Sequence, residues 1–144
     1  MTRPETPQLT VDIIIELTDR PDHSIVLIER KYEPCGWAIP GGFVDVGETL
    51  EHAARREAKE ETSLEVTLTS LLGCYSDPAR DPRGHTVCAV YVATASGEPV
   101  AQDDAAALAL FDPGHCPPLA FDHAVIIEDY RRFRATGRPT PLRD

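Results

Sequence analysis

The chain has 144 residues, a length that suits one domain, because two independent cores would each be very small. Hydrophobic residues make up 42% and charged residues 26%, which is typical of a soluble globular protein rather than a disordered one. With 24 acidic and 14 basic residues, the formal net charge is −10, which disfavours broad electrostatic binding to nucleic acid or to an acidic membrane surface. Small anionic substrates stay compatible with this charge, because a bound metal ion inverts the local field.

Neither a membrane span nor a secretory signal is predicted. The longest apolar run, residues 87–95, is interrupted by Thr94 and is far shorter than the roughly 20 residues that a spanning helix needs. The polar start of the chain, residues 1–8, carries two prolines and does not resemble a secretory signal. The four cysteines are far apart and form no Cys-x-x-Cys motif, so we expect reduced thiols in a cytoplasmic protein.

Six strands are predicted, because segments rich in β-branched or apolar residues alternate with turn and loop signals. In chain order they are residues 9–17, 24–29, 37–40, 64–75, 86–94 and 107–111. The first two strands are expected to pair as a hairpin across a turn built on Pro21 and Asp22. Gly73 is expected to mark a bulge in the fourth strand. A loop over residues 43–48 follows the third.

Two helices are predicted, one in the middle of the chain and one near its end. Residues 49–62 contain no glycine or proline and are dense in helix-forming residues, so they predict a helix with Thr49 as its N-cap. Residues 121–135 predict the closing helix. This order of elements predicts an α/β fold with a mixed sheet flanked by two helices. The whole chain is expected to form one domain with flexible tails at residues 1–7 and 137–144.

The helix over residues 49–62 carries acidic side chains on the face that should be apolar. At about 100° per residue, one stripe of this helix combines small or apolar side chains with carboxylates. The stripe consists of Leu50, Ala53, Ala54, Glu57, Ala58 and Glu61, and Glu60 lies beside it. Carboxylates on a partly buried face repel one another, and either protonation or a divalent cation relieves that repulsion. All-oxygen ligands suit Mg²⁺ or Mn²⁺ better than zinc.

A helix rich in glutamate is more often simply a charged surface helix, and composition alone favours that alternative. Two features count against it. The carboxylates share their stripe with Leu50 and the alanines. The helix also follows Gly41-Gly42, whose flexible backbone could turn carbonyl oxygens toward the same ion. On the residues alone, both interpretations stay open.

The same segment resembles the Nudix box, G-x5-E-x7-R-E-U-x-E-E-x-G-U, in which U is apolar. At the required spacing the chain has Gly42, Glu48 and the run Arg56-Glu57-Ala58-Lys59-Glu60-Glu61-Thr62-Ser63-Leu64. Residues 37–45 are also similar to the segment that leads into the box. Ser63 replaces the final glycine of the motif, and we expect it at the helix end in the left-handed conformation, at a cost on the order of 1 kcal/mol.

The resemblance implies a Nudix α/β/α sandwich that hydrolyses a nucleoside diphosphate linked to another group. By motif position, the Mg²⁺ ligands would be the carbonyl oxygen of Gly41 and the carboxylates of Glu57, Glu60 and Glu61. Mn²⁺ is the expected substitute metal. Arg56 would pair with Glu48 and brace the loop against the helix. The metal would bridge the acidic protein to the pyrophosphate and acidify the attacking water.

Weaker resemblance extends to short bacterial and archaeal members described as ADP-ribose pyrophosphatases. It is carried by residues 76–86, 102–106 and 119–123. That subgroup usually has a glutamate a few residues after an Asp-Asp pair, whereas residues 106–108 of this chain are apolar. Asp103, Asp104 or Glu98 could take the acidic role instead, and the first two are candidate substrate-binding residues.

Arg80 and Arg83 are the only lysine or arginine residues between positions 60 and 130. As mobile cations on a Pro/Gly-rich loop, they could clamp a phosphate or a terminal ribose of the substrate. The alternative is that each pairs with Asp77 or Asp81 and merely orders the loop. The two possibilities are about equally supported by the sequence.

Three functions remain compatible with the sequence. Hydrolysis of ADP-ribose to AMP and ribose 5-phosphate is favoured, and a nucleoside triphosphate pyrophosphohydrolase of the sanitising type is the enzymatic alternative. A non-catalytic ligand-sensing domain is the third, but it needs an output module for which this length leaves no room. The expected partner is a small-molecule nucleotide, which Tyr32, Trp37 or Phe121 could contact by stacking if they do not lie in the core. Nucleic acid and membranes are not expected partners, and a homodimer is left open.

Overall fold

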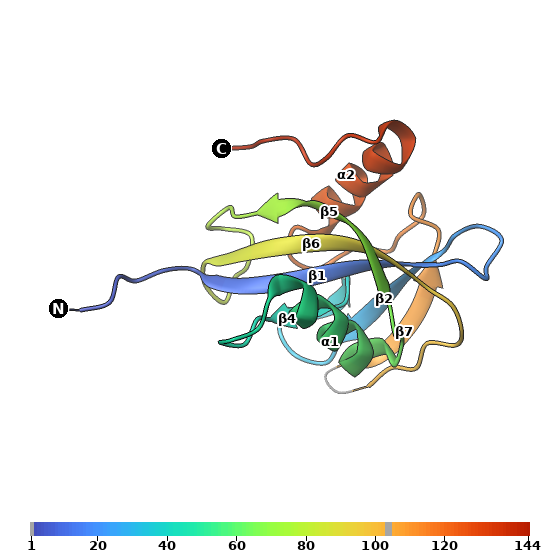
Figure 1. Ribbon diagram of the computed structural model, residues 1–144, viewed down its shortest axis with the longest axis horizontal. Helices are drawn as coiled ribbons and strands as arrows, with labels where there is room; N and C mark the ends of the chain where they lie inside the picture. Colours follow the sequence, from blue (N-terminus) through green and yellow to red (C-terminus); the bar gives the residue numbers. More distant parts are fainter. Residues whose placement is uncertain (1, 103–104) are drawn as a thin grey trace.

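The computed structural model describes residues 2–102 and 105–144 of the chain. Within these residues, seven strands form one mixed sheet, and two helices pack on opposite faces of it (Figure 1). In chain order the elements are β1 (Gln8–Leu17), β2 (Ile25–Arg30), β3 (Gly36–Ala38), β4 (Gly41–Phe43), α1 (Leu50–Thr62), β5 (Thr67–Tyr75), β6 (Thr86–Ala95), β7 (Ala105–Phe111) and α2 (His123–Thr136). Neither helix in this described part is long and apolar enough to cross a membrane.

The strand β1 lies at the centre of the sheet, whose order is β3-β2-β1-β6-β5. It runs parallel to β6 over its whole length and antiparallel to β2 and β4, while β7 pairs with β2. A strand that is covered on both faces needs a nearly continuous apolar sequence, which explains why β1 does not alternate cleanly between apolar and polar residues. Val11, Ile13 and Ile15 belong to the core beneath α1, whereas Ile14 packs on the side of α2.

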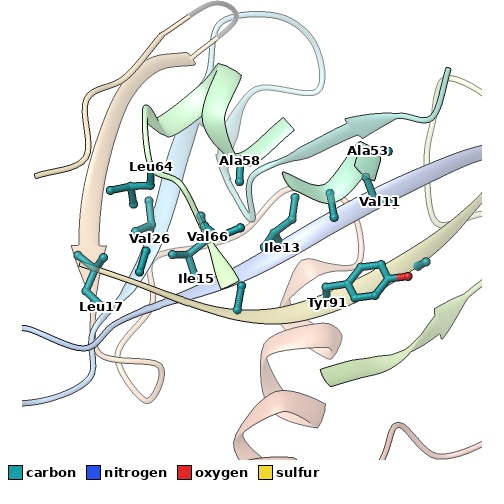
Figure 2. Packing of buried hydrophobic residues seen from close by; sticks show 14 residues of the cluster. Val11, Ile13, Ile15, Leu17, Val26, Ala53, Ala58, Leu64, Val66 and Tyr91 are labelled. Carbon is teal, nitrogen blue, oxygen red and sulfur yellow. The ribbon is translucent and has the colours of Figure 1, made fainter. Parts of the chain in front are cut away.

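The core beneath α1 combines alanines on the helix with branched side chains on the strands (Figure 2). Ala53, Ala54 and Ala58 have no exposed surface and pack with Val11 and Ile13. Because alanine side chains are small, the helix axis lies close to the sheet. The carboxylates farther along the same helix face, Glu57 and Glu61, therefore lie at the edge of the core.

Most predicted elements are confirmed by the structure. The strands predicted first, second and fifth correspond to β1, β2 and β6, and β1 pairs antiparallel with β2 as a hairpin. The first helix begins after Thr49, whose side-chain oxygen accepts a hydrogen bond from the backbone N–H of His52 at 3.1 Å. The helix ends at Ser63, which has the expected left-handed conformation with φ of 64°. A register shift between β5 and β6 lies beside Gly73, where a bulge was predicted.

The strand β4 was not predicted, because the third strand was expected to end at Pro40 and a loop was expected from residue 43. Two of its three residues are glycines, so it carries no side-chain pattern that a sequence could reveal. It forms because it pairs with residues 10–12 of β1. β7 likewise begins at Ala105, two residues earlier than expected, where it pairs with the end of β2.

The segment after α2 has no helix or strand, as predicted, but several contacts attach it to the sheet and to α2. The backbone N–H of Thr140 donates to the carbonyl of Leu72 at 3.0 Å. Arg143 donates two hydrogen bonds to the carboxylate of Asp129, at 2.7 and 2.8 Å. A Cβ atom at Gly73 would lie 2.5 Å from Cβ of Thr140, so glycine is required there for the segment to pass. Residues 2–7, the other predicted tail, are exposed.

Candidate active site

A cavity of about 350 Å³ opens beside the central strand, between the C-terminal half of α1 and the loop that precedes α2. Its wall combines Glu57 and Glu61 from α1 with Gly41 and Gly42 from β4 and with Asp12 from β1. These three carboxylates lie near one another, while other parts of the wall carry both acidic residues and basic ones: Glu33, Asp45, Asp81, Arg30, Lys31, Arg80 and Arg83. The part of the wall that holds these three carboxylates attracts cations, whereas the basic residues favour an anionic group.

The position of Glu57 depends on the absence of a side chain at Gly42. A Cβ atom built on Gly42 would lie 2.5 Å from Oε1 of Glu57, well inside van der Waals contact. A side chain at position 42 would displace this carboxylate, so glycine leaves room for it beside β4. The motif glycine thus has a packing reason that the sequence alone did not reveal.

Glu61 is the most deeply buried acidic residue of α1, with 9% of its surface exposed. Its Oε2 is the one buried side-chain nitrogen or oxygen atom of the described residues that has no hydrogen-bond partner. Burial, together with the nearby negative charge of Glu57, raises the pKa of Glu61 to about 8. A buried carboxylate oxygen without a partner, in a wall of oxygen donors, fits a hard divalent cation.

Arg56 connects the acidic residues around the entrance of the cavity. Its Nε and Nη2 donate to the two carboxylate oxygens of Glu48 at 2.6 and 2.8 Å, so the predicted ion pair is present. Nη1 donates to Glu57 at 2.9 Å and to Glu60 at 3.1 Å, and Nη2 also donates to the carbonyl of Phe43 at 3.1 Å. The hydrogen bonds from Arg56 and from a backbone amide hold the pKa of Glu48 well below its usual range. One guanidinium thus ties the loop over residues 43–48 to the helix.

Glu60 lies differently from the other two predicted metal ligands. Its side chain is 46% exposed, bonds to Arg56, and is not part of the cavity wall. The described residues contain no cluster of three His, Cys, Asp or Glu side chains close enough to form a complete metal cage. Glu57, Glu61 and the backbone of Gly41 face the cavity together, whereas Glu60 does not.

Arg80 is not the mobile cation that the sequence suggested. It is 8% exposed, and its guanidinium donates to Asp122 at 2.8 and 3.0 Å and to Oγ1 of Thr86 at 2.8 Å. The alternative partners Asp77 and Asp81 were also wrong for this residue. The sequence could not show this, because Asp122 lies 42 positions away and meets Arg80 only through the fold. Arg80 lines the cavity as a fixed part of its wall.

Arg83 pairs with Asp81 at 2.9 and 3.1 Å, as one of the two alternatives proposed. Its side chain is nevertheless 41% exposed and lines the cavity. The guanidinium lies 5.4 Å from the ring centre of Phe43 and 5.3 Å from that of Phe121, so two aromatic rings flank it. Arg83 is therefore the arginine of this loop that is accessible from the cavity.

Of the remaining candidate residues that the structure describes, only Tyr32 and Phe121 are found in the cavity wall. Asp103 and Asp104 lie outside the described residues. Glu98 is exposed and bonds to Arg20 at 2.7 Å, and it does not line the cavity. Tyr32 and Phe121 do line it, whereas the ring of Trp37 packs against Phe111 in the core.

Sequence reasoning missed two buried cavity residues, Asp12 and His123. Asp12 interrupts an otherwise apolar strand, a signal that could have been noticed, since a lone acidic residue in a buried strand requires partners. Nε2 of His123 lies 3.1 Å from Oδ2 of Asp12, although the two residues are 111 positions apart. Only the fold brings them together.

The raised pKa of Glu61 predicts how the stability of the metal-free protein depends on pH. Its folded-state pKa of about 8 lies above the ordinary value of 4.5, so the parent should lose stability as the pH rises through this interval. In chelator, we expect Glu61→Gln to be more stable than the parent by about 2–5 kcal/mol at the upper end of the interval and by little at the lower end. Urea unfolding at several pH values measures the difference. An equal difference at all pH values would contradict this account, and the exposed Glu128→Gln is the control.

Comparisons with known proteins identify the family of this chain. The NUDIX domain model matches residues 6–130. A Methanocaldococcus jannaschii protein named ADP-ribose pyrophosphatase is 49% identical over 132 residues, which cover 89% of this chain and 75% of that protein. The ADPR responsive transcriptional repressor NtrR of Acinetobacter baylyi is 29% identical over 95% of this chain, which spans 58% of the repressor.

Solved structures show the same fold. The MutT/nudix family protein of Enterococcus faecalis superposes with a TM-score of 0.81 at 31% identity, covering 94% of this chain and 65% of that one. The NUDIX domain of Shewanella oneidensis NrtR, solved in complex with ADP ribose, gives a TM-score of 0.79 at 28% identity, covering 92% of this chain and 90% of that domain. Since the family model spans most of the sequence and these structures share its architecture, the chain belongs to the Nudix family.

Proposed function

We propose that the protein is a Mg²⁺-dependent pyrophosphohydrolase that cleaves ADP-ribose into AMP and ribose 5-phosphate. The observation that carries this proposal is the unpartnered Oε2 of Glu61, buried in a cavity wall that also contains Glu57. Carboxylate oxygens held in this way suit a cation that bridges to a pyrophosphate. The choice of ADP-ribose is supported by the 49% identical relative whose name states that activity.

The cation would be held by the carboxylates of Glu57 and Glu61 and by the carbonyl oxygen of Gly41, with Mn²⁺ as a substitute. When bound, it would polarise the phosphoryl oxygens and lower the pKa of the attacking water. Glu60 accepts a hydrogen bond from Arg56 at 3.1 Å and does not line the cavity. Its role as a ligand therefore remains a prediction, as does the acidic role of Asp103 or Asp104.

The protein's own residues supply orientation. Arg56 donates to Glu57 and to both oxygens of Glu48, so it fixes the direction of one cavity carboxylate and the course of the loop before α1. Arg83, held between two aromatic rings, presents a cation at the cavity wall. In an acidic protein this side chain is suited to a phosphate oxygen pair or to adjacent ribose hydroxyls.

A ligand-sensing role is the second candidate, because two of the similar proteins are NtrR and NrtR, the latter solved with ADP ribose. A sensor would bind ADP-ribose without turning it over. The catalytic interpretation is favoured by the box glutamates, all of which are present in this chain. A sanitising triphosphatase is less supported, since the putative 8-oxo-dGTP diphosphatase of Bacillus subtilis matches only 42% of this chain.

The proposal also covers the cellular location, the binding partner and the oligomeric state of the protein. All four cysteines are free thiols, which suits a reducing, cytoplasmic location. The partner is a small nucleotide, and the net charge of −10 disfavours nucleic acid as a partner. A homodimer remains a prediction that light scattering of the purified chain can test.

A substrate panel with and without metal tests the proposed function. We expect hydrolysis of ADP-ribose with Mg²⁺ or Mn²⁺, a higher specificity constant for ADP-ribose than for ATP, and no turnover in chelator. Glu61→Gln should nearly abolish turnover while the protein stays folded. Turnover in chelator, or an unchanged rate in Glu61→Gln, would contradict the cation site. Tight binding of ADP-ribose without turnover would instead support a sensor.

Loss of Arg56 should damage activity through geometry. Arg56→Ala removes the partner of Glu48 and the donor to Glu57, and a displacement of about 1 Å in such a site costs on the order of 100-fold in rate. Arg56→Lys keeps the charge but not the planar fork of donors, so it should recover only part of the loss. Kinetics and a structure of Arg56→Ala provide the measurement. The account is wrong if the loop over residues 43–48 and Glu48 do not move.

Arg83 is predicted to contribute to substrate preference. Arg83→Ala should lose one charge-assisted contact, about 1.5–3 kcal/mol, which is a factor of roughly 10 to 150 in the specificity constant for ADP-ribose. The loss should be smaller for ATP, which lacks the terminal ribose that this contact is expected to reach. Arg55→Ala, exposed on α1 and away from the cavity, is the control. An unchanged ratio between the two substrates would mean that Arg83 only orders its loop.

A further inference from the structure

A buried polar cluster lies in the cavity wall outside the Nudix box, at the first residue of α2. His123 is 3% exposed and Asp12 is 7% exposed, and both line the cavity. Nε2 of His123 lies 3.1 Å from Oδ2 of Asp12. The thiol of Cys88 donates to the same carboxylate oxygen at 3.2 Å. Two donors from different elements therefore converge on one oxygen of Asp12.

The backbone of Ile39 determines which nitrogen of His123 carries the proton. The N–H of Ile39 donates to Nδ1 of His123 at 3.0 Å, so Nδ1 must be the acceptor nitrogen of the ring. In that tautomer the ring hydrogen is on Nε2, directed at Asp12. His123 is thus fixed as a donor to Asp12 by a main-chain group of the segment that leads into β4.

The other oxygen of Asp12 lies against the glycine that the proposed cation site uses. Asp12 is paired with Gly41 in the register of β1 and β4, and a Cβ atom on Gly41 would lie 2.1 Å from Oδ1 of Asp12. The backbone N–H of Gly41 faces Glu61 and opposes the rise in its pKa. The contacts therefore run in order from His123 to Asp12, Gly41 and Glu61.

We propose that His123 is a positioning residue for the cation-binding wall, where its Nε2–H holds the Asp12 carboxylate beside Gly41 and Glu61. The proposal rests on the proposed function, since it concerns the same cation. A buried Asp–His pair costs more desolvation than an apolar pair of similar size, so stability alone gives no reason for it at this place. Held in this position, Asp12 adds a fixed negative charge to the wall that a divalent cation would meet.

The backbone just before α2 adopts an unfavourable conformation two residues ahead of His123. Phe121 has a positive φ of 55°, which is costly for a residue with a large side chain. Asp122, between them, receives the two hydrogen bonds from Arg80. Three consecutive side chains thus each contact a different residue of the cavity wall: Phe121 contacts Arg83, Asp122 accepts from Arg80, and His123 contacts Asp12.

Binding of Mn²⁺ alone, measured by the electron paramagnetic resonance of the free ion, tests the proposal without turnover. His123→Asn places an amide oxygen near the position of Nδ1 and so keeps the acceptor for Ile39, but it loses the donor to Asp12. We expect its Mn²⁺ affinity to fall by about 10- to 100-fold, as is usual for residues that orient the surroundings of a metal. His123→Gln places its amide N–H near the position of Nε2, so it should restore affinity toward that of the parent. His115→Asn, exposed and remote from the cavity, should bind as the parent does.

The outcomes separate the two proposals. A parent protein that binds no Mn²⁺ would overturn the cation site itself. A parent that binds, together with a folded His123→Asn of equal affinity, would overturn only the positioning role. Equal weakening in His123→Asn and His123→Gln would also overturn it, because the loss would then not follow the bond to Asp12. If His123→Asn does not fold, Asp12→Asn decides the question: weakened Mn²⁺ binding supports the proposal, and parent-like binding refutes it.

Discussion

The close approach of α1 to the sheet is the constraint on which the site depends. Three alanines with no exposed surface form the contact face of the helix, and Gly42 has no side chain to separate β4 from Glu57. This packing places Glu61 where only 9% of its surface remains exposed. A larger side chain at Ala54 or Ala58 would widen the gap between α1 and the sheet, and one at Gly42 would displace the Glu57 carboxylate.

The buried carboxylates of α1 make the metal-free protein less stable, and the same carboxylates suit the binding of a cation. Burial raises the pKa of Glu61, and the charge of Glu57 adds to the rise. Ionisation of Glu61 in the metal-free protein is therefore unfavourable at neutral pH. Arg56 compensates part of this charge, but its donors are directed at Glu48, Glu57 and Glu60, not at the buried oxygen of Glu61. A divalent cation held there would supply the missing positive charge and would also favour binding of an anionic substrate. An acidic protein can in this way accommodate a pyrophosphate.

Local signals were sufficient for much of the fold and for part of the site. The helix over residues 50–62 follows from its composition and its N-cap, and β1 and β6 follow from runs of branched residues. The fixed spacing of the motif placed Arg56 opposite Glu48, since both lie within one loop–helix unit. The strand β4 escaped notice, because two glycines carry no pattern and only the pairing with β1 makes them a strand.

The sequence by itself therefore determined the helix, its stripe of alanine and glutamate, most of the strands and the family resemblance, because each of these depends on neighbours along the chain. The tertiary structure alone decided which groups the cavity contains. It buried Arg80 against Asp122, left Arg83 accessible between two rings, and turned Glu60 outward onto Arg56. It also joined Asp12 to His123 across 111 positions. No local rule anticipates such pairs, because hydrogen bonds between distant segments form only after the sheet and both helices have fixed where those segments lie.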